Sequence, residues 1–512
     1  MDTRSTNWKS NRRDFLRSAA SVGAGLVFSP SVFGRTSGGT KPDDINVALL
    51  GAGAQGHRLM EAICLRNIPG VRIKVVCDIW TKYNQRKTSL LLQRHKHTHN
   101  VYEDYREMLD QEKDHLDAVI VATPDFWHSR HTVAGLEAGL HVYCEPEMSN
   151  TLEGARAMVQ AAKRTGKLLQ IGRQRRSNPM YVHCYERLMK EAKLLGRITT
   201  INGQWNRSRR SCEDRGWPSH YTIDDATLNK YEFESMHQFR NWQWYKGKGG
   251  GQIVTRGSHQ IDVFSWFLEA DPTTVIADGG IDYWKGREWY DNVMAIYEYQ
   301  TKEGTVKALY QTITTNDSGG YYEKFMGVEG TLVISEHSWG NKAERQWWVE
   351  AEKWEPWIKK GYLKSNAPPK KVSESGIEII PDPSLPSPPP SYDIPVSWEY
   401  KPYHLLHLEN FFDAIRGKAA LNCPAEVGYK TAVAVLKISE AIQAGRKLNF
   451  HSDEFVVYDP QKERIEHIIG TKLPESVRNC RYHSKNYGMG HGIGWGVLRD
   501  LQSGHAVPTG RI

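Results

Sequence analysis

The amino-acid sequence predicts an α/β fold: a doubly wound parallel sheet, followed by an α+β domain built on an open antiparallel sheet. Three observations support this prediction. Apolar runs alternate with helix-like segments over residues 45–171, as in βα units. A glycine-rich turn follows the first apolar run. Beyond residue 176, runs of alternating apolar and polar residues are separated by turns, which is typical of antiparallel strands.

The first element is a strand predicted over residues 45–50, and it leads into the glycine turn. Gly51 permits the tight turn, Gly53 lets the backbone approach a pyrophosphate, and Gly56 lets the following helix pack closely on the strand. Together with Gln55, these residues open a helix whose free N–H groups suit phosphate oxygens. A glycine turn can also be purely structural, but the strand–turn–helix context favours a dinucleotide site.

A second strand is predicted over residues 72–77 and ends in Asp78. An acidic residue ~20 positions beyond such a glycine turn holds the ribose hydroxyls of NAD. Because its carboxylate would repel the 2′-phosphate of NADP, the sequence predicts NAD as the cofactor, with NADP less favoured.

The remaining α/β elements bring further polar residues to the carboxyl ends of the strands. Ligands of open parallel sheets bind there, so we expect Thr123, Pro124, His128 and Glu145 to line the nucleotide site. His128 could equally be a capping or core histidine. The segments expected in this part are helices near 56–66, 81–95, 102–109, 131–138 and 152–165, and strands over 116–122, 140–144 and 168–171.

The second domain begins after residue 176 with a predicted helix over 181–193. Positions 259, 262, 263 and 266 share one face of a further helix, so His259 and Asp262 could both face a cleft. The strands expected here span 197–205, 274–283, 293–299, 305–315 and 321–334, with turns and no helices between them. Two amphipathic helices are expected over 407–417 and 425–445.

Composition excludes several classes of protein. The net charge is +8 over 512 residues, but the basic residues are spread along the chain, which argues against a nucleic-acid partner. The seven cysteines are widely spaced and form no C-x-x-C pair, so neither a disulfide framework nor a metal site is expected. No apolar run reaches the ~18 residues of a membrane span.

Aromatic residues are numerous, with 17 Trp and 24 Tyr. Several lie in polar surroundings, as in the stretch 241–245 (Asn-Trp-Gln-Trp-Tyr). Sugar rings stack on such flat faces, which favours a carbohydrate ligand. Aromatic packing beneath loops explains any single one of these residues equally well.

The N-terminus carries twin arginines, Arg12 and Arg13, followed by Phe15-Leu16 and a mildly apolar segment over 18–33. This arrangement predicts a twin-arginine export signal and hence a periplasmic or secreted protein; a disordered basic tail is the alternative. Export in the folded state suits a protein that acquires its nucleotide in the cytoplasm. The predicted organisation is a signal and linker over 1–40, a nucleotide domain over 41–176, a substrate domain over 177–450 with a Pro-rich insertion over about 355–398, and an extension of unassigned role over 451–512.

Taken in order, these landmarks resemble the Gfo/Idh/MocA oxidoreductases, named for glucose–fructose oxidoreductase and inositol dehydrogenase. The resemblance covers residues 44–450 and rests on the glycine turn, Ala122–Asp125 with His128, Cys144-Glu145, the segment 249–262 and Asn410–Gly417. It implies a Rossmann domain, an NAD(P) cofactor, and oxidation or reduction of a sugar or cyclitol hydroxyl. Members of the family often form homo-oligomers, and the open sheet offers a surface for this.

Two positions depart from the family pattern. Pro146 stands where the family usually has a lysine that helps proton transfer, and Thr255 stands where it often has an acidic residue. His259 is retained, and we expect it to be the base that takes the hydroxyl proton, oriented by Asp262 or by a backbone group. Its structural alternative is a helix-start histidine bonded to the backbone. Candidates to replace the lysine are Arg173, Arg175, Arg176, Arg256, Tyr181 and His183, and Tyr181 joins the predicted catalytic set.

Three functions are compatible with these residues, each with a small-molecule carbohydrate as the partner. The first is an exported NAD(P)-dependent oxidoreductase that acts on a hydroxyl of a sugar, glycoside or cyclitol by hydride transfer. The second is an NAD-dependent enzyme that cleaves glycosides through a transient 3-keto sugar. The third is a non-catalytic homologue that binds nucleotide or sugar.

Overall fold

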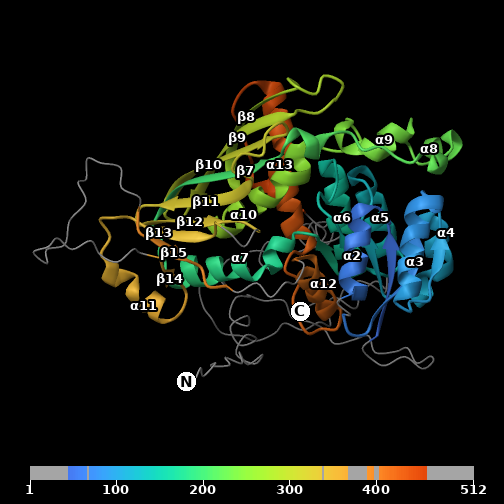
Figure 1. Cartoon of the computed structure of the whole chain (residues 1–512), viewed down its shortest axis with the longest axis horizontal. Coiled ribbons are helices and arrows are strands. Elements are labelled where there is room, and N and C mark those ends of the chain that lie inside the picture. Colours follow the sequence, from blue (N-terminus) through green and yellow to red (C-terminus); the bar gives the residue numbers. More distant parts are fainter. Residues whose placement is uncertain (1–43, 66–67, 337–339, 367–388, 397–402, 458–512) are drawn as a thin grey trace, which may run out of the picture. The chain divides into compact units, whose positions relative to one another are not determined.

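The computed structural model of the chain describes residues 44–65, 68–336, 340–366, 389–396 and 403–457. Two sheets with their covering helices make up this part of the chain (Figure 1). The predicted export signal and linker, and nearly all of the predicted extension, lie outside the described residues.

The first sheet has six parallel strands in the order β3-β2-β1-β4-β5-β6. The strand order reverses between β1 and β4, and the carboxyl ends of these two strands therefore flank the crevice in which ligands of such sheets bind. The strands are β1 (Ile45–Leu50), β2 (Val71–Cys77), β3 (Asn100–Tyr102), β4 (Ala118–Val121), β5 (His141–Cys144) and β6 (Leu169–Ile171). The helices are α2 (Ala54–Leu65), α3 (Arg86–Arg94), α4 (Tyr105–Glu112), α5 (Asp125–Glu137) and α6 (Leu152–Thr165).

Local sequence explains these elements. Strand β4 is apolar and buried at all four positions, as expected of a central parallel strand. Helix α6 begins where the hydroxyl of Thr151 accepts the N–H of Gly154, and it ends at Gly166 in the left-handed conformation. Helix α5 begins at Asp125, six residues before the predicted start, because Pro124 in an extended conformation ends the preceding loop there. His128 therefore lies on a helix and not in a loop.

The second sheet has ten strands in the order β14-β15-β13-β12-β11-β7-β10-β9-β8-β16. Strands β7 and β10 pair in parallel, so the sheet is mixed and not purely antiparallel as predicted. The prediction that no helix separates its strands is also wrong, because α8, α9 and α10 lie between β7 and β8 in the sequence. The predicted strand 321–334 is two strands, β11 and β12.

The bounds in this domain are as follows. The strands are β7 (Ile198–Asn206), β8 (Pro272–Gly280), β9 (Asn292–Thr301), β10 (Gly304–Ile313), β11 (Tyr321–Gly327), β12 (Gly330–Ile334), β13 (Lys342–Arg345), β14 (Lys364–Ser365), β15 (Ser391–Asp393) and β16 (Leu448–Asn449). The helices are α7 (Pro179–His183), continued by a π-helical segment over Cys184–Glu191, α8 (Asp225–Lys230), α9 (Met236–Asn241), α10 (Ser258–Leu268), α11 (Glu355–Lys359), α12 (Tyr403–Ile415) and α13 (Ala425–Ala444).

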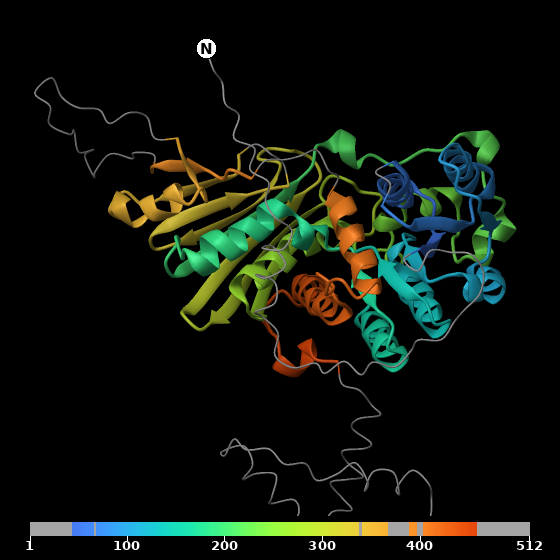
Figure 2. The ribbon, with the colours of Figure 1, turned by 90° about the horizontal axis from the view of Figure 1, so that it is seen from below.

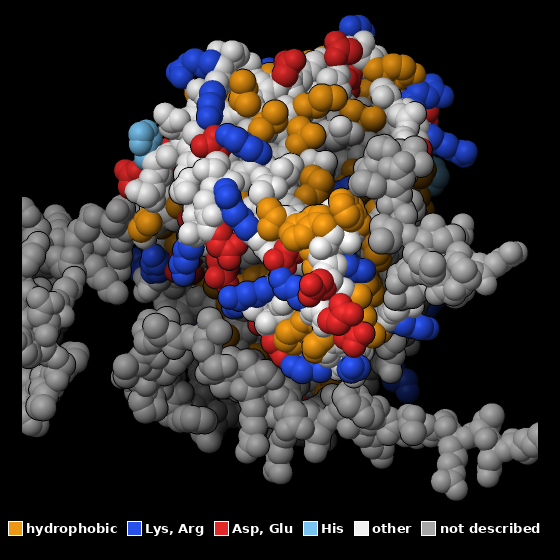
Figure 3. Space-filling view, turned by 90° about the vertical axis from the view of Figure 1, so that its left-hand side faces the viewer, with side chains coloured by type: hydrophobic (Ala, Val, Ile, Leu, Met, Phe, Trp, Pro, Cys, Tyr) orange, Lys and Arg blue, Asp and Glu red, His pale blue; other side chains and the backbone are white. Residues whose placement is uncertain are grey.

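Helices α7, α10 and α13 cover one face of the second sheet (Figure 2). The opposite face exposes apolar side chains of β8, β9 and β10: Ile276, Met294, Ile296 and Leu309. Ile296 stands opposite both Ile276 and Leu309 in the register, so three of these four side chains are neighbours. On the side of the molecule that Figure 3 shows, cationic and acidic side chains are interspersed, and this side carries no continuous basic surface.

Helix α12 returns the chain from the second sheet to the first and packs beside α2 (Figure 1). Its apolar side chains Leu405, Leu408, Phe411 and Phe412 share a buried cluster with β1, β2 and α2. The start of α12 is thereby held close to the crevice of the parallel sheet. In the described ranges, six cysteines are free and buried, and no helix is long and apolar enough to cross a membrane.

Candidate active site

The glycine turn between β1 and α2 leaves open space on its ligand side. A Cβ on Gly51 would lie 2.6 Å from the carbonyl oxygen of Ala122, and one on Gly56 would lie 1.9 Å from that of Gly51. These two glycines are therefore required by the turn itself. A Cβ on Gly53 would meet only Asn84 Nδ2, at 3.9 Å. Gly53 thus borders space that a pyrophosphate can fill, and the residues present fit a dinucleotide.

Asp78 supports this turn from the end of β2. Its carboxylate accepts hydrogen bonds from the backbone N–H groups of Ala52 (2.7 Å) and Trp80 (2.7 Å) and from the side chain of Asn84 (3.4 Å). Burial raises the pKa of Asp78, and the three hydrogen bonds oppose that shift. Because a carboxylate offers about four acceptor positions, one remains for a ribose hydroxyl. That role of Asp78 stays a prediction.

Three arginines near the glycine turn act on one another through their charges. Arg58 on α2 faces Arg215, and Arg215 faces Arg240. Burial, together with these like charges, lowers the pKa of both Arg215 and Arg240. The guanidinium of Arg240 lies 5.1 Å from the centre of the Trp80 ring. Such a cluster attracts an anion, and the phosphates of a dinucleotide are anions of that kind.

His128 and its neighbours tie the strand-end loops together. His128 is buried, and its ring nitrogens Nδ1 and Nε2 lie 2.7 Å from the carbonyl oxygen of Glu147 and 2.6 Å from that of Thr123. Burial lowers the pKa of His128, whereas the two carbonyl groups raise it. The hydroxyl of Thr123 lies 3.0 Å from His131 Nδ1, and Pro124 caps α5. Both ring nitrogens of His128 thus contact backbone carbonyls of the strand-end loops, and its place at the nucleotide site stays a prediction.

Glu145 lies at the carboxyl end of β5 and is buried, and its Oε1 atom has no hydrogen-bond partner among the described residues. Burial raises the pKa of Glu145 to about 7, although Gln55, Tyr143 and the charges of Arg173 and Arg58 oppose this. The fold therefore brings Gln55 and Glu145 together, while their contact with a nucleotide stays a prediction. A buried acceptor without a partner is available to a hydroxyl or amide group of a ligand.

A buried ion pair occupies the neighbourhood of the missing lysine. Glu147 follows Pro146 and is fully buried, and Arg173 Nη2 donates to its Oε2 atom at 2.6 Å. Arg173 Nη1 donates to the hydroxyl of Ser258, also at 2.6 Å, and Ser258 directly precedes His259. Among the six replacement candidates, Arg173 thus bridges the loop of the missing lysine and the helix of the expected base.

Arg175 is a second buried arginine whose charge is balanced. It pairs with Glu323 and with Glu336, the latter at 3.2 Å between Nε and Oε2. The hydroxyl of Tyr181 donates to Glu323 at 2.7 Å, and the Tyr181 side chain is fully buried. Tyr181 therefore supports this ion pair, and the structure does not present its hydroxyl to the cleft as the predicted catalytic role requires.

Asp262 lies one helical turn beyond His259 but is engaged elsewhere. Arg176 binds it with two hydrogen bonds of 2.9 Å, and the hydroxyl of Thr431 on α13 donates to it at 2.9 Å. Although burial alone would raise it, these partners hold the pKa of Asp262 below its ordinary value. The structure contains no hydrogen bond from Asp262 to His259, which corrects the expectation that Asp262 orients the histidine.

His259 lies in the first turn of α10 and is 9% exposed. Its Nδ1 atom is buried and has no hydrogen-bond partner in the described part of the chain. Its ring lies 5.9 Å from that of Trp205. Burial, followed by the charges of Arg175 and Arg173, holds the pKa of His259 well below 6.5. The imidazole is therefore uncharged at neutral pH, which is the form a general base requires.

A second histidine, His404, joins the site from α12, and the sequence did not single it out. Its buried Nδ1 atom also lacks a partner in the described residues, and its charge would act on His259. Burial lowers the pKa of His404, Glu336 raises it and Arg58 lowers it further. The helical pattern of residues 403–415 gives no sign that this helix returns to the nucleotide crevice, so no local signal could have found it.

Thr255 and two further candidates to replace the lysine, Arg256 and His183, contact other groups. The hydroxyl of Thr255 donates to a backbone carbonyl one turn earlier at 2.9 Å. Arg256 Nη1 contacts Cys212 Sγ at 3.8 Å, and His183 Nε2 lies 3.0 Å from the carbonyl oxygen of Tyr362. The candidate active site therefore consists of His259, His404, Glu145 and the paired arginines Arg173 and Arg175.

Two family models match most of the described chain. The model of the oxidoreductase family with an NAD-binding Rossmann fold matches residues 45–173. The model of the C-terminal alpha/beta domain of the same oxidoreductase family matches residues 193–450. The two models together therefore include Glu145 and Arg173 from the first domain and His259 and His404 from the second.

The curated relatives match about a third of this chain, whereas the solved structures match about four fifths of it. A glycosyl hydrolase family 109 protein of Shewanella baltica and an alpha-N-acetylgalactosaminidase of Shewanella oneidensis are each 29% identical over 177 residues, 31% of this chain and 38% of their own length. Levoglucosan dehydrogenase in complex with NADH and levoglucosan has a TM-score of 0.57 and 18% identity over 79% of this chain and 99% of its own. Myo-inositol 2-dehydrogenase from Lactobacillus plantarum has a TM-score of 0.54 and 15% identity over 80% and 100%. The two structures show a shared fold.

Proposed function

Because the chain belongs to the Gfo/Idh/MocA family of oxidoreductases, we propose that it uses NAD to oxidise or reduce a hydroxyl-bearing carbon of a sugar, glycoside or cyclitol. One observation carries this proposal: His259 is an uncharged imidazole whose Nδ1 atom has no hydrogen-bond partner among the described residues, close to the strand ends where the nucleotide is expected. The dehydrogenases of the same fold, one of them solved with NADH and levoglucosan, support it.

NAD supplies the hydride acceptor when it is bound. His259 takes the proton of the substrate hydroxyl while the hydride leaves the same carbon, so that a carbinol becomes a carbonyl. The charges of Arg173 and Arg175 disfavour a protonated His259. The proton must therefore be transferred from His259 to another group. His404, whose Nδ1 atom has no hydrogen-bond partner in the part of the chain that the structure describes, is the neighbouring group that can receive it.

The preference for NAD over NADP is part of the proposal and rests on Asp78. Its buried carboxylate beside the glycine turn leaves no room for a second negative charge, whereas one remaining acceptor position suits a ribose hydroxyl. Asp78→Asn keeps the size of the side chain and removes the charge. We expect it to narrow the ratio of the NAD and NADP dissociation constants; an unchanged ratio would contradict the assignment.

Glycoside cleavage is a second candidate function, favoured by the two histidines and by the names of the curated relatives. Oxidation at C3 of the sugar acidifies the hydrogen on C2. One histidine removes that proton, the bond between C1 and the glycosidic oxygen breaks, and the departing oxygen takes a proton from a protonated group. Water then adds to C1, C2 regains a proton and the hydride returns to C3, so that no net NADH is formed.

The deciding experiment compares two readouts on one preparation. The purified protein is denatured to release and identify any bound nucleotide, and native samples are mixed with free sugars and with aryl glycosides. A rise in 340 nm absorbance with sugars indicates the oxidoreductase, and release of the aryl group without net NADH indicates the glycosidase. Binding of NAD or sugar without either signal indicates a non-catalytic homologue. Both enzymatic proposals would be refuted if the purified protein contained no nucleotide and did not bind added NAD.

Export is a separate proposal, based on Arg12 and Arg13 and the apolar segment after them. We expect the wild-type protein in the periplasm or medium and the Arg12→Lys/Arg13→Lys variant in the cytoplasm. Cell fractionation with an antibody measures this, and equal distribution of the two proteins would count against a twin-arginine signal.

Self-association through the exposed face of the second sheet is also proposed. Ile276, Met294, Ile296 and Leu309 leave apolar surface in contact with water there. Sedimentation of the wild type should show a species larger than one chain, and Ile296→Asp should shift it to the monomer. A wild-type monomer would contradict this.

A further inference from the structure

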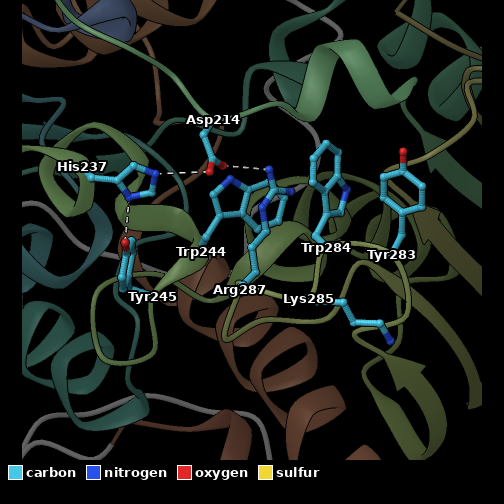
Figure 4. A pocket seen from close by; sticks show the side chains of 9 residues that line it. Asp214, His237, Trp244, Tyr245, Tyr283, Trp284, Lys285 and Arg287 are labelled. Atoms are coloured by element: carbon cyan, nitrogen blue, oxygen red, sulfur yellow. Dashed lines mark hydrogen bonds and ion pairs between the residues drawn. The ribbon is translucent and has the colours of Figure 1, made fainter.

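A cavity of about 180 Å³ lies between the end of α9 and the loop that joins β8 to β9 (Figure 4). It is smaller than the ~300–1,000 Å³ of pockets that enclose a drug-sized ligand, so it admits a single small unit. Its lining combines aromatic rings with charged side chains: Asp214, His237, Trp244, Tyr283, Trp284 and Arg287.

Two buried donors in this lining have no hydrogen-bond partner among the described residues. They are the indole N–H of Trp244, which is 2% exposed, and Nη1 of Arg287, which is 9% exposed. A buried donor without an acceptor costs about 1–3 kcal/mol. Both side chains line the cavity, so oxygen atoms of a ligand that reached these two donors would remove that cost.

Arg287 is fixed in place before any ligand arrives. Its guanidinium lies 3.7 Å from the centre of the Trp244 ring and 4.0 Å from that of Trp284. Its Nη2 atom donates to the carbonyl of Cys212 and to Asp214, the latter at 2.9 Å. A donor held by two rings and two acceptors loses little entropy when it binds.

The same cavity offers acceptors and a flat apolar face. Asp214 lies 3.2 Å from His237 Nε2, and His237 Nδ1 lies 2.7 Å from the hydroxyl of Tyr245. Tyr283 is half exposed and its ring meets that of Trp284 edge to face at 5.1 Å. Figure 4 shows the Tyr283 and Trp284 rings side by side at one end of the cavity. A ring whose C–H groups point to one face can stack there.

Two contacts connect the cavity with the candidate active site. Cys212, whose carbonyl binds Arg287, also contacts Arg256, three residues before His259. Arg215, which follows Asp214, faces Arg58 and hence the neighbourhood of Glu145. The cavity is therefore connected through Cys212 to Arg256, in the segment that precedes His259.

From this arrangement we propose that the cavity is a subsite for one pyranose unit, the unit adjacent to the one that is oxidised. This rests on the proposed function and makes its substrate a glycoside or oligosaccharide of at least two units. A pyranose carries hydroxyl oxygens for the two unpartnered donors and an apolar C–H face for the exposed ring. A purely aromatic ligand would leave Nη1 of Arg287 and the Trp244 N–H without acceptors.

Binding is measured first, without turnover. The full chain is titrated by calorimetry with the methyl glycosides of glucose, galactose and N-acetylgalactosamine, and with indole. Trp244→Phe removes one donor and keeps a ring against Arg287, and Tyr283→Ala removes the half-exposed ring. The control is Trp347→Phe, which changes an exposed tryptophan outside the cavity. NAD binding by each variant verifies its fold.

We expect at least one methyl glycoside to bind the wild type and the control alike and to bind both cavity variants about tenfold more weakly. Where turnover occurs, cellobiose or lactose should be preferred over glucose or galactose by the wild type, and Tyr283→Ala should lose that preference. Equal binding by all variants, no binding by the wild type, or indole binding in place of the glycosides overturns the subsite. Weakened glycoside binding without any turnover retains the subsite and refutes the proposed function instead.

Discussion

On the nucleotide side of the candidate site, the groups expected to meet a ligand are backbone atoms: Gly53 borders open space, and Asp78 holds the turn by a hydrogen bond to the N–H of Ala52. On the substrate side they are side chains with less than a tenth of their surface exposed, among them His259, Arg173 and Arg175. The first arrangement recognises a constant shape, that of a pyrophosphate. The second sets the protonation of its groups through burial and charge.

The substrate side divides further into paired and unpaired groups. The arginines there are balanced by Glu147, Glu323 and Glu336. Within the described ranges, the Nδ1 atoms of His259 and His404 have no hydrogen-bond partner. Paired charges fix positions and create a field, while the unpaired, uncharged rings remain free to accept protons. We therefore expect the ion pairs to hold the site in shape and the histidines to transfer protons.

The largest effect should come from His259→Ala. If the unpaired ring is the base, turnover falls by ~10²–10⁴-fold, the usual contribution of general acid–base catalysis. NAD binding should be unchanged, because the imidazole of His259 is not one of the groups expected to hold the nucleotide. Steady-state rates and calorimetric titration with NAD measure the two quantities on the same sample.

His183→Gln is the matched control for that variant, since His183 is bonded to the Tyr362 carbonyl outside the site. It should retain wild-type turnover. Wild-type turnover in His259→Ala would remove this histidine from the mechanism and leave His404 as the base to be tested next.

The scaffolding role of the ion pairs is tested by Glu147→Gln. It leaves Arg173, which is 1% exposed, as a buried charge without its carboxylate. Removing one partner of a buried pair costs about 3–5 kcal/mol of unfolding free energy. Urea unfolding followed by fluorescence measures this loss.

Glu298→Gln breaks the surface pairs with Lys307 and Lys447 and gives the comparison. Exposed pairs contribute about 0–1 kcal/mol, so this variant should unfold close to the wild type. Similar losses in the two variants would mean that the pair between Glu147 and Arg173 does not hold the substrate side together.

Gly53→Ala tests the nucleotide side and should have a smaller effect. The new Cβ would contact no protein atom closer than 3.9 Å, so the unfolding temperature should stay unchanged. The methyl group would occupy space meant for the pyrophosphate and weaken NAD binding about tenfold, or 1.4 kcal/mol. Gly56→Ala should do the opposite and destabilise the fold, because its Cβ would lie 1.9 Å from the carbonyl oxygen of Gly51. Full NAD affinity in Gly53→Ala would place the phosphates elsewhere.

The two sides of the cleft also differ in how far the sequence could predict them. Gly51, Gly53, Gly56 and Asp78 lie within 28 residues in one βα unit, and local patterns sufficed to predict both the elements and their meeting point. The parallel sheet was predicted well because continuous apolar runs specify buried strands. The start of α5 was missed because Pro124 permits a helix to begin directly after it.

The substrate side joins segments that are far apart in the sequence. His259 and His404 are separated by more than a hundred residues, and only the packing of α12 on α2 brings the second one to the crevice. Tyr181 and Asp262 were placed correctly on helices, but helical position does not reveal that Glu323 and Arg176 engage them. The parallel pairing of β7 with β10 was missed for the same reason, since strand patterns do not encode the direction of a distant partner.

The smallest predicted effect concerns pH and separates the unpaired histidine from the rest of the site. The pKa of His259 is held well below 6.5 in the folded protein and lies near ~6.5 in the unfolded chain. Between these two values the unfolded chain binds one more proton, so folding stability falls as pH drops below ~6.5 and is fully present above it. His259→Asn cannot take up that proton. Thermal unfolding at pH 7.5 and 5.5 should therefore show a smaller acid-induced loss in His259→Asn than in the wild type, and His220→Asn, at an exposed position, should behave as the wild type does. An equal loss in all three proteins would contradict this prediction, because it would mean that folding does not lower the pKa of His259.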